Sequence, residues 1–495
     1  MSRLLYDIET NGLMPDVDTV WCLVTKDVDT LEVREYYGDT LYEGWRSLTA
    51  ADTQIGHNII NYDAPVIKHV LGLDVPKHVE VIDTLVMSRL GNPNRAGGHS
   101  LEAWGETLGV PKVEHEEWDR FSPEMLKRCR GDVELNYLVW KRLEKMFEVM
   151  PKAVHIEMET AKVIQRMCER GVHFDAKAGF ELFHTLMAEQ EDLERMAYAI
   201  LPAVYKPKGK PKALKRDANR GHWGHGMVDA EVEFQEVTYT QLNPTSRQDV
   251  ARYFIENHGW QPTSLTDTGQ PKVDDEILRG LPWDEAQVFA DLFGIQKLIG
   301  YLNGEIQKNG RGGGWLHHVT DKGKLHANFI PLTAVTGRPS CTSPNLQQVS
   351  TDKRARRLFG PRPGWVQVGV DADGQELRCL GHYLFRYDGG AYAKEVIEGD
   401  IHSRVQELIG FHTRNGTKPV EYGLIYGAGN PKLGMISMKD AMSVGKTIAL
   451  PVDREGKRIR KAILSGITGF KELGEDVKTK AMREGRLRGI DGRTL

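Results

Sequence analysis

The order of strand-like and helical segments along the chain constrains its fold more than any other feature. Residues 1–150 open with short apolar runs typical of strands, at 4–6, 20–24 and 33–37, and end in a helical pattern at 123–146. Strands followed by helices within one segment indicate an α/β or α+β domain. This order predicts a first domain that ends near residue 150.

The rest of the chain changes its pattern twice more. Residues 151–305 are mainly helical, most clearly at 155–170 and 180–200. Strand-like runs return from about 325 around Asp371, and the pattern is helical again from about 400. Because 495 residues are too many for one hydrophobic core, we expect an α/β and α+β multidomain protein.

Composition excludes several classes of protein. No stretch is apolar for long enough to cross a membrane, and acidic residues among the first ten argue against a signal peptide. The five scattered cysteines form no C-x-x-C pair, which argues against disulfides or zinc and fits a reducing cytoplasm. A net charge of −4 is compatible with a nucleic-acid partner where basic residues cluster.

Basic residues do cluster at 206–220, KPKGKPKALKRDANR, where seven of them accompany one acid. Proline and glycine in this stretch predict a loop. It is either a solvated linker or a loop that follows DNA phosphates, and composition alone favours neither.

Four acids in the first 150 residues suggest a site for divalent cations. Asp7 and Glu9 are two apart on a predicted strand, so they share one face and repel each other unless a cation lies between them. Asp63 follows a loop, and Asp132 lies on a predicted helix. Four carboxylates can hold two Mg²⁺ ions, which assist phosphodiester hydrolysis. Taken singly, each acid is more often a helix cap or a solvated side chain.

A second set of acids follows the apolar-flanked run at 365–370, which predicts a buried strand. The sequence VDADGQELR at 370–378 contributes Asp371, Asp373 and Glu376. Acids at a strand end favour a cation, and a catalytic metal site needs a further carboxylate from elsewhere in the chain.

A helical stretch near residue 420 carries three side chains spaced by four, Arg414, Lys418 and Tyr422. This spacing places all three on one helix face, where two cations and an aromatic ring suit a nucleoside triphosphate. Alone, the pattern is more often a solvated face.

Together these motifs resemble family A DNA polymerases, most closely the replicative enzymes of short-tailed phages. DIE at 7–9, HNIINYD at 57–63 and RGDV at 130–133 resemble their DEDD 3′–5′ exonuclease domain, and 370–378 and 414–429 resemble their motifs A and B. Further matching pieces include IDTL at 82–85, SLEAWG at 100–105, GVHFD at 171–175, NPTSRQ at 243–248, GQPKVDDEIL at 269–278, QKLIG at 296–300, TGRPS at 336–340, PNLQQ at 344–348 and GDIHS at 399–403.

The resemblance implies a domain order. A ribonuclease H-like exonuclease domain would occupy 1–150, and a right-hand polymerase domain would follow. Its thumb would span 151–325 with the basic loop, the first part of the palm 326–400 and the fingers 401–495. Asp83 is a rival for a metal role in the first domain, but an Asp before an apolar helical run is more often an N-cap.

The resemblance also implies residue roles. In the exonuclease, Asp7, Glu9, Asp63 and Asp132 would be catalytic, with Asp7, Glu9 and Asp132 as magnesium ligands. In the polymerase, two Mg²⁺ ions would be held by Asp371 and the Ala372 carbonyl. The incoming nucleotide would contact Glu376, His402, Arg414, Lys418 and Tyr422, with Lys418 protonating pyrophosphate, and primer–template DNA would contact Arg338, Gln348 and Lys297.

Four departures from the family pattern follow. Arg128 replaces a tyrosine that orients the attacking water, and it is four residues from Asp132, which predicts an ion pair that competes with the metal. Pro419 means either that the helix starts near Lys418 or that it is kinked. No His-Asp-Glu motif is present to supply the second carboxylate to Asp371, and Asp373 replaces a small residue.

The predicted function is therefore template-directed DNA polymerisation in a phage replication system, with proofreading, in the bacterial cytoplasm. Its partners would be DNA, dNTPs and a host processivity factor. Polymerisation would need a missing C-terminal segment that carries the His-Asp-Glu motif: either a second polypeptide completes the palm, or the sequence is a truncated polymerase. The alternative is a 3′–5′ exonuclease or a non-catalytic DNA-binding fragment without polymerase activity.

Overall fold

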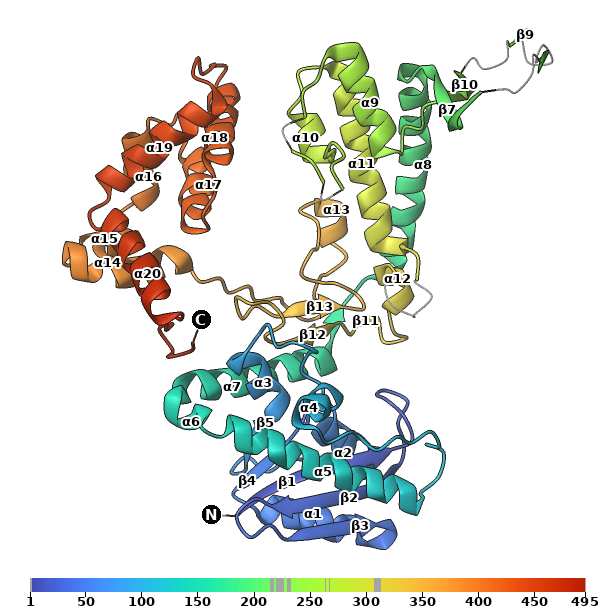
Figure 1. Cartoon of the computed structure of the whole chain (residues 1–495), viewed down its shortest axis with the longest axis vertical. Helices are drawn as coiled ribbons and strands as arrows, with labels where there is room; N and C mark the ends of the chain where they lie inside the picture. Colours follow the sequence, from blue (N-terminus) through green and yellow to red (C-terminus); the bar gives the residue numbers. More distant parts are fainter. Residues whose placement is uncertain are drawn as a thin grey trace. The chain divides into compact units, whose positions relative to one another are not determined.

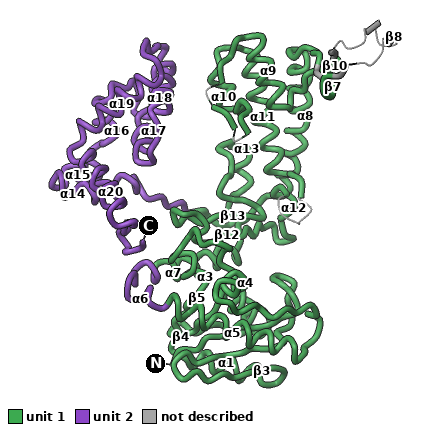
Figure 2. The backbone as a smooth tube through the Cα atoms, viewed as in Figure 1, with its two compact units in different colours: residues 1–143, 156–367 green, residues 144–155, 368–495 purple. Residues whose placement is uncertain are grey.

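The computed structural model describes residues 2–213, 218–219, 227–228, 233–262, 264–266, 268–306 and 313–494. The chain divides into two units, shown in Figure 2. The first comprises residues 1–143 and 156–367, and the second comprises residues 144–155 and 368–495. The finer division into exonuclease, thumb, palm and fingers stays a prediction.

Five strands of the first unit form a mixed sheet in the order β3-β2-β1-β4-β5 (Figure 1). The central strand β1 (Arg3–Thr10) pairs antiparallel with β2 (Val20–Asp27) and parallel with β4 (Thr53–Gly56). β3 (Val33–Tyr37) pairs with β2, and β5 (Glu80–Asp83) with β4. The three strands predicted near the N-terminus are confirmed.

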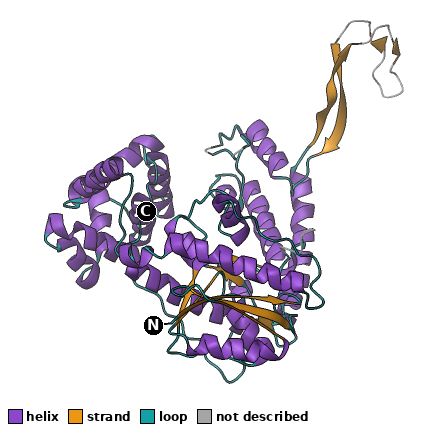
Figure 3. Cartoon of the chain, turned by 60° about the horizontal axis from the view of Figure 1, so that its bottom comes forward, coloured by secondary structure: helices purple, strands orange, loops and turns teal. Residues whose placement is uncertain are grey.

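Helices cover both faces of this sheet (Figure 3). On one face, α1 (Leu41–Ala50) packs on β2 and β3, where Gly44 lets it approach Leu23 and Tyr36 closely. On the other, α5 (Pro123–Leu143) packs on β1 and β2, and Cys129 donates a hydrogen bond to the Asp7 carbonyl. The predicted α/β segment is confirmed. The remaining helices near the sheet are α2 (Asp63–Leu71), α3 (Thr84–Gly91) and α4 (Leu101–Leu108).

Long helices follow the sheet. α7 (Pro151–Arg170) and α8 (Ala176–Ile200) confirm the helices predicted at 155–170 and 180–200. α8 packs along α11 (Asp284–Asn303), whose buried face includes Phe289 and Phe293. The other elements of this unit are α9 (Arg247–His258), α10 (Asp275–Arg279), α12 (Trp315–His318), α13 (Lys353–Arg356), β6 (Val172–His173), β8 (Ala218–Asn219), β9 (Met227–Val228), β11 (Lys324–Leu325), β12 (Asn328–Ile330) and β13 (Ser340–Thr342).

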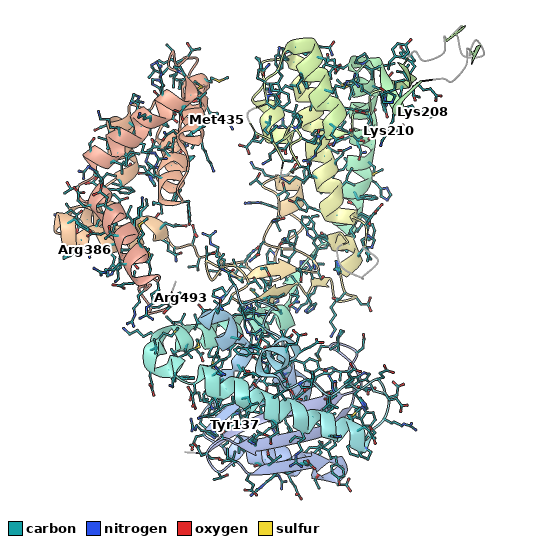
Figure 4. The ribbon with its side chains drawn as sticks, in the orientation of Figure 1. Tyr137, Lys208, Lys210, Arg386, Met435 and Arg493 are labelled. Carbon is teal, nitrogen blue, oxygen red and sulfur yellow. The ribbon has the colours of Figure 1, made fainter. Side chains whose placement is uncertain are left out.

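A two-stranded ribbon corrects the loop predicted at 206–220. β7 (Ala203–Ala213) pairs antiparallel with β10 (Glu233–Gln241), and the ribbon extends away from α8 (Figure 3). The pairing satisfies the backbone although proline and glycine are frequent, because Gly209 adopts a positive φ of 74° at an irregularity in the ladder. Lys208 and Lys210 project from this ribbon (Figure 4). Residues 214–217 and 220 of the basic run lie outside the described residues.

The predicted buried strand before Asp371 is wrong. Residues 366–372 have no regular secondary structure, and Val366, Val368 and Val370 are 84%, 79% and 93% exposed. Among the described residues no strand pairs with this segment, so nothing buries its alternate side chains or satisfies its backbone groups.

The second unit is built from helices around one hydrophobic core, which confirms the helical pattern predicted from about residue 400. Its helices are α6 (Met146–Val149), α14 (Gln375–Asp388), α15 (Ala391–Glu398), α16 (Ile401–Ile409), α17 (Arg414–Ile425), α18 (Asn430–Ser443), α19 (Val452–Gly466) and α20 (Phe470–Glu484).

The backbones of α18 and α19 approach each other closely at two glycines. A Cβ added at Gly434 would lie 1.9 Å from the Val452 carbonyl oxygen, and one at Gly456 would lie 1.8 Å from the Asn430 carbonyl oxygen. Glycine therefore sets the spacing of this pair at both positions. Among the described residues, none of the helices combines the length and apolar character needed to cross a bilayer.

Candidate functional site

Three acids predicted to act together meet beside the central strand. Asp7, Glu9 and Asp132 each place a carboxylate oxygen within 4.8 Å of the others. The alternation of β1 directs Asp7 and Glu9 to the face covered by α5, and Asp132 lies on that helix. We refer to these three residues as the acid trio.

Asp63 lies beside the acid trio rather than within it. It is the first residue of α2 and is only 3% exposed. Its charge raises the pKa of Asp7, in addition to the larger effect of burial, so the two carboxylates lie within electrostatic reach. The four predicted acids thus gather in one region, three of them at metal-binding spacing.

Two basic side chains pair with the acid trio, and they correct a predicted contact. Arg128 was expected to pair with Asp132 but instead places Nε 3.2 Å from Glu9 Oε1. Lys112 Nζ lies 2.8 Å from Asp132 Oδ2. The expected pairing of Arg128 with Asp132 is absent because each has another partner. Glu9 on the sheet pairs with Arg128, and Lys112, from the segment before α5, pairs with Asp132.

Burial disfavours the charged form of every acid in this region. It raises the pKa of Glu9 to about 7, an effect that Arg128 opposes, and it raises the pKa of Asp63 to about 8. Burial also raises the pKa of Asp7 and of Asp132, and for Asp132 Lys112 opposes the shift. Ionisation of all four acids is therefore unfavourable in this region unless cations accompany them.

The acid trio suits a hard divalent cation such as Mg²⁺. Carboxylate oxygens are the ligands that this ion prefers, and three lie at compatible spacing. Asp132 Oδ1 is buried and has no hydrogen-bond partner among the described residues, so it is available as a ligand. A pocket of about 430 Å³ opens onto all four acids and is also lined by His57, Tyr62, Arg89, His99, Lys112 and Arg128.

Asp83 is an N-cap, as predicted. Its carboxylate accepts hydrogen bonds from the backbone N–H groups of Leu85 and Val86 at the start of α3. It also accepts from the N–H groups of Asn58 and Ile60. With its oxygens used by four backbone donors, Asp83 fixes the loop that precedes Asp63.

The second predicted site lies on α17. Arg414 and Lys418 are exposed and Tyr422 is half-buried, whereas Thr417, Val420, Glu421 and Leu424 are buried. The three predicted side chains therefore share the outer part of the helix. Pro419 lies inside this helix, which begins at Arg414, so the alternative start near Lys418 is wrong. A proline inside a helix removes one hydrogen bond and crowds the carbonyl four residues earlier, so the kinked alternative stays a prediction.

Acids engage two of the predicted nucleotide-binding side chains. Arg414 donates two hydrogen bonds to Asp400, at 2.8 and 3.0 Å, and these bonds lower the pKa of Asp400. His402 pairs through Nδ1 with Oε2 of the buried Glu421. Both basic side chains thus already have acidic partners within the second unit.

A buried acid fixes the start of α17. Asp440 accepts hydrogen bonds from the N–H groups of His412, at 2.7 Å, and Thr413, at 3.1 Å, and from the Thr413 hydroxyl. The Thr413 hydroxyl in turn accepts from the Gly416 N–H and caps the helix. The position of Arg414 therefore depends on a residue of α18.

The acids near Asp371 are more dispersed. Asp371, Ala372 and Asp373 are exposed, and Arg378 donates to the Asp373 carbonyl oxygen at 2.7 Å. Glu376 accepts a hydrogen bond from the Tyr426 hydroxyl at 3.1 Å. Among the described residues, Asp371 belongs to no group of three ligands at metal-binding spacing. These residues by themselves do not fit a two-metal site.

The predicted DNA contacts divide between two places in the first unit. Lys297 on α11 and Gln348 are exposed and line one open groove. Arg338 is exposed in the turn after β12 and does not line that groove.

Sequence analysis missed five residues that contact or hold the predicted site residues: Lys112, Asp400, Glu421, Tyr426 and Asp440. Glu421 precedes Tyr422 in the motif that drew attention to α17, so its burial was accessible from helix periodicity. Lys112 and Asp440 contact their partners from other segments of the chain, so no spacing in the sequence predicts these contacts.

Comparisons with known proteins agree with this architecture. The family described as DNA polymerase family A matches residues 217–488. The DNA-directed DNA polymerases of Escherichia phage T7 and Enterobacteria phage T3 are each 28% identical to the chain, over 99% of it and 85% of their own length. A solved structure of the POL domain of Pol1 from M. smegmatis, complexed with DNA primer-template and dNTP, has a TM-score of 0.65 at 16% identity. The match covers 99% of this chain and 77% of the solved chain, and it supports the fold. The chain therefore belongs to DNA polymerase family A and is a DNA-directed DNA polymerase of the phage type.

Proposed function

We propose that this polymerase combines template-directed DNA synthesis in a phage replication system with a 3′–5′ proofreading exonuclease at the acid trio. The observation that carries the exonuclease proposal is the meeting of Asp7, Glu9 and Asp132 within 4.8 Å in a pocket of about 430 Å³. A pocket of that volume can accept one nucleotide.

In the exonuclease, Asp7, Glu9 and Asp132 would hold Mg²⁺, with Asp63 beside them. Two bound divalent ions supply an activated water and stabilise the leaving oxygen of a phosphodiester. The sheet and α5 hold the ligands in place, and Asp83 orders the loop that leads to Asp63. The family tyrosine is absent at position 128, so no side chain there can orient water as a phenol does.

In the polymerase, the α17 face would bind the incoming nucleotide. Arg414, Lys418 and His402 would contact the triphosphate, with Lys418 as the proton donor to pyrophosphate. Tyr422 would lie by the base and Glu376 beneath the sugar. Phosphate would have to replace Asp400 and Glu421 as the partners of Arg414 and His402.

Asp371 and the Ala372 carbonyl would provide one part of the polymerase metal site, and a further segment would provide the second carboxylate. The exposed valines 366, 368 and 370 alternate as in a strand that lacks a neighbour. An apolar groove of about 710 Å³, lined partly by Leu325, Phe359 and Trp365, lies beside the start of this run. We propose that a strand carrying a carboxylate packs there, from the same polypeptide or from another.

Primer–template DNA and dNTPs would be the main partners. Lys297, Gln348 and Arg338 would contact DNA through its backbone, which carries no sequence information. Lys208 and Lys210 of β7 would add phosphate contacts, and a host processivity factor is a further proposed partner. The polymerase would act in the cytoplasm of the infected bacterium.

For the 495-residue chain by itself, a second candidate is an exonuclease or DNA-binding protein without polymerase activity. The exposure of Asp371, with no second carboxylate at metal-binding spacing among the described residues, favours it.

One assay separates these functions. The purified chain is incubated with a 5′-labelled primer–template and Mg²⁺, with and without the four dNTPs, alongside Asp371→Ala and the double variant Asp7→Ala/Glu9→Ala. Shortening that only the double variant loses supports the exonuclease, and unchanged shortening in that variant rules it out. Extension that Asp371→Ala abolishes means that this chain needs no further segment.

A further inference from the structure

The acid trio carries its own positive charges. Lys112 Nζ is 2.8 Å from Asp132 Oδ2, and Arg128 Nε is 3.2 Å from Glu9 Oε1. The oxygens that these cations contact belong to two of the three residues that would hold Mg²⁺. The carboxylates that would bind metal are therefore already paired with Lys112 and Arg128.

The two cations are held to different degrees. Arg128 is 16% exposed and donates a second hydrogen bond to the Val113 carbonyl at 2.6 Å, and its guanidinium lies 5.2 Å from the centre of the Trp118 ring. Lys112 is 26% exposed, and its described ion pair is the one with Asp132. Arg128 is therefore held by three contacts, whereas the flexible side chain of Lys112 can move its ammonium group away from Asp132.

The segment that carries Lys112 is itself fastened across the sheet. The Trp21 indole donates a hydrogen bond to the Trp118 carbonyl at 2.8 Å, and Phe121 stacks on Tyr37 at 4.9 Å. With Arg128 bound to Val113, these contacts keep Lys112 near Asp132 even when its ammonium group moves away. Lys112 can thus return whenever a metal ion leaves.

The two carboxylate oxygens of Asp132 differ in their contacts. Its Oδ1 is buried and has no partner among the described residues, while Oδ2 is occupied by Lys112. A divalent ion that enters as Lys112 withdraws would therefore give Oδ1 the partner that it lacks. Full coordination requires the lysine to withdraw, because an ammonium group and a metal ion repel each other at this distance.

We propose that Lys112 is a displaceable internal counter-ion that competes with divalent metal for the acid trio, and that Arg128 is its fixed companion. This inference rests on the proposed exonuclease function of the trio. It makes Lys112 a positioning residue that sets the metal concentration at which the exonuclease becomes active. The polymerase would then begin proofreading only when enough free metal is present to expel the lysine.

The test measures Mn²⁺ binding to the full chain by the loss of the free-ion EPR signal, with wild type, Lys112→Met and Lys112→Gln. Both variants should bind Mn²⁺ at the trio about tenfold more tightly than wild type. Lys127→Met is the matched control, since Lys127 is exposed on α5, and it should leave the affinity unchanged. Asp7→Ala/Glu9→Ala identifies which bound ions belong to the trio.

A second readout protects the test against misfolding. Thermal unfolding of each variant with increasing Mn²⁺ should show a larger metal-dependent rise in Tm for Lys112→Met than for wild type. Equal Mn²⁺ affinity in wild type and both Lys112 variants overturns the inference but leaves the exonuclease proposal standing. If no ion is lost in Asp7→Ala/Glu9→Ala, the metal site itself is absent and both proposals fall.

Discussion

The two acidic sites of this polymerase are built in opposite ways. Asp7, Glu9 and Asp132 are fixed between a central strand and a packed helix, at metal-binding spacing and with cations beside them. Asp371 lies on an exposed segment with no regular structure and no such neighbours among the described residues. The comparison shows that one set of acids is brought together by its own strand and helix, whereas Asp371 has no other acid at metal-binding spacing among the described residues.

The largest expected effect separates the two sites by activity. Asp132→Asn should lower magnesium-dependent release of 3′ nucleotides by about a thousandfold, because a buried metal ligand is lost without a change of shape. Asp371→Asn should leave this release unchanged. The measurement is the release rate from a 3′-labelled single strand. A comparable loss in Asp371→Asn would show that the two sites are not independent.

The next effect tests how α17 is held. Asp440→Ala should destabilise α17 by about 2–4 kcal/mol, since three donors of the 412–413 turn lose a buried charged acceptor. Asp476→Ala, which removes an exposed ion pair with Arg386, should cost about 0.5 kcal/mol or less. Hydrogen exchange of residues 414–425 should be faster in Asp440→Ala and unchanged in Asp476→Ala. Equal protection in the two variants would mean that Asp440 does not position Arg414.

The pH dependence of the first unit provides a smaller effect. Burial raises the pKa of Asp63 to about 8, far above the value of about 4 in an unfolded chain. Folding therefore takes up a proton between these values, and stability should fall as pH rises from about 4 to 8. Asp63→Asn removes this contribution and should stabilise the metal-free unit by about 1–3 kcal/mol at pH 8.

Denaturant unfolding at pH 5 and pH 8, followed by tryptophan fluorescence, measures this difference. The advantage of Asp63→Asn over wild type should be small at pH 5 and larger at pH 8. A constant offset between the two proteins at both pH values would contradict the assigned shift.

The smallest effect concerns the exposed segment. Val368→Thr should change the stability of the chain by about 0.5 kcal/mol or less, because the side chain is 79% exposed. Val133→Thr, at a fully buried position of α5, should cost about 1–3 kcal/mol. Urea unfolding compares them. A similar cost at both positions would show that the segment is buried in solution and that the contrast between the sites is smaller than described.

Local sequence pattern predicted much of the first unit. The strands near residues 5, 22 and 35 and the helices α5, α7 and α8 follow from periodicity, and the N-cap role of Asp83 follows from its place before an apolar run. Alternation along the strand predicted that Asp7 and Glu9 share one face, whereas the expectation that Asp132 joins them came from the resemblance to the exonuclease domain.

Features that depend on distant partners could not be predicted in this way. Arg128 lies four residues from Asp132, yet it pairs with Glu9, because the sheet places a carboxylate closer to it. The run at 365–370 has the composition of a buried strand, but a strand is buried only where another one pairs with it. The basic run reads as a loop until β10 supplies the second strand of the ribbon.

The contact between α18 and α19 limits which substitutions this helix pair can accept. With glycine at 434 and 456, each backbone approaches a carbonyl oxygen of the neighbouring segment too closely for a Cβ atom. Even alanine at either position would require one of the two helices to shift. The sequence at these two positions is therefore set by backbone spacing and not by side-chain chemistry.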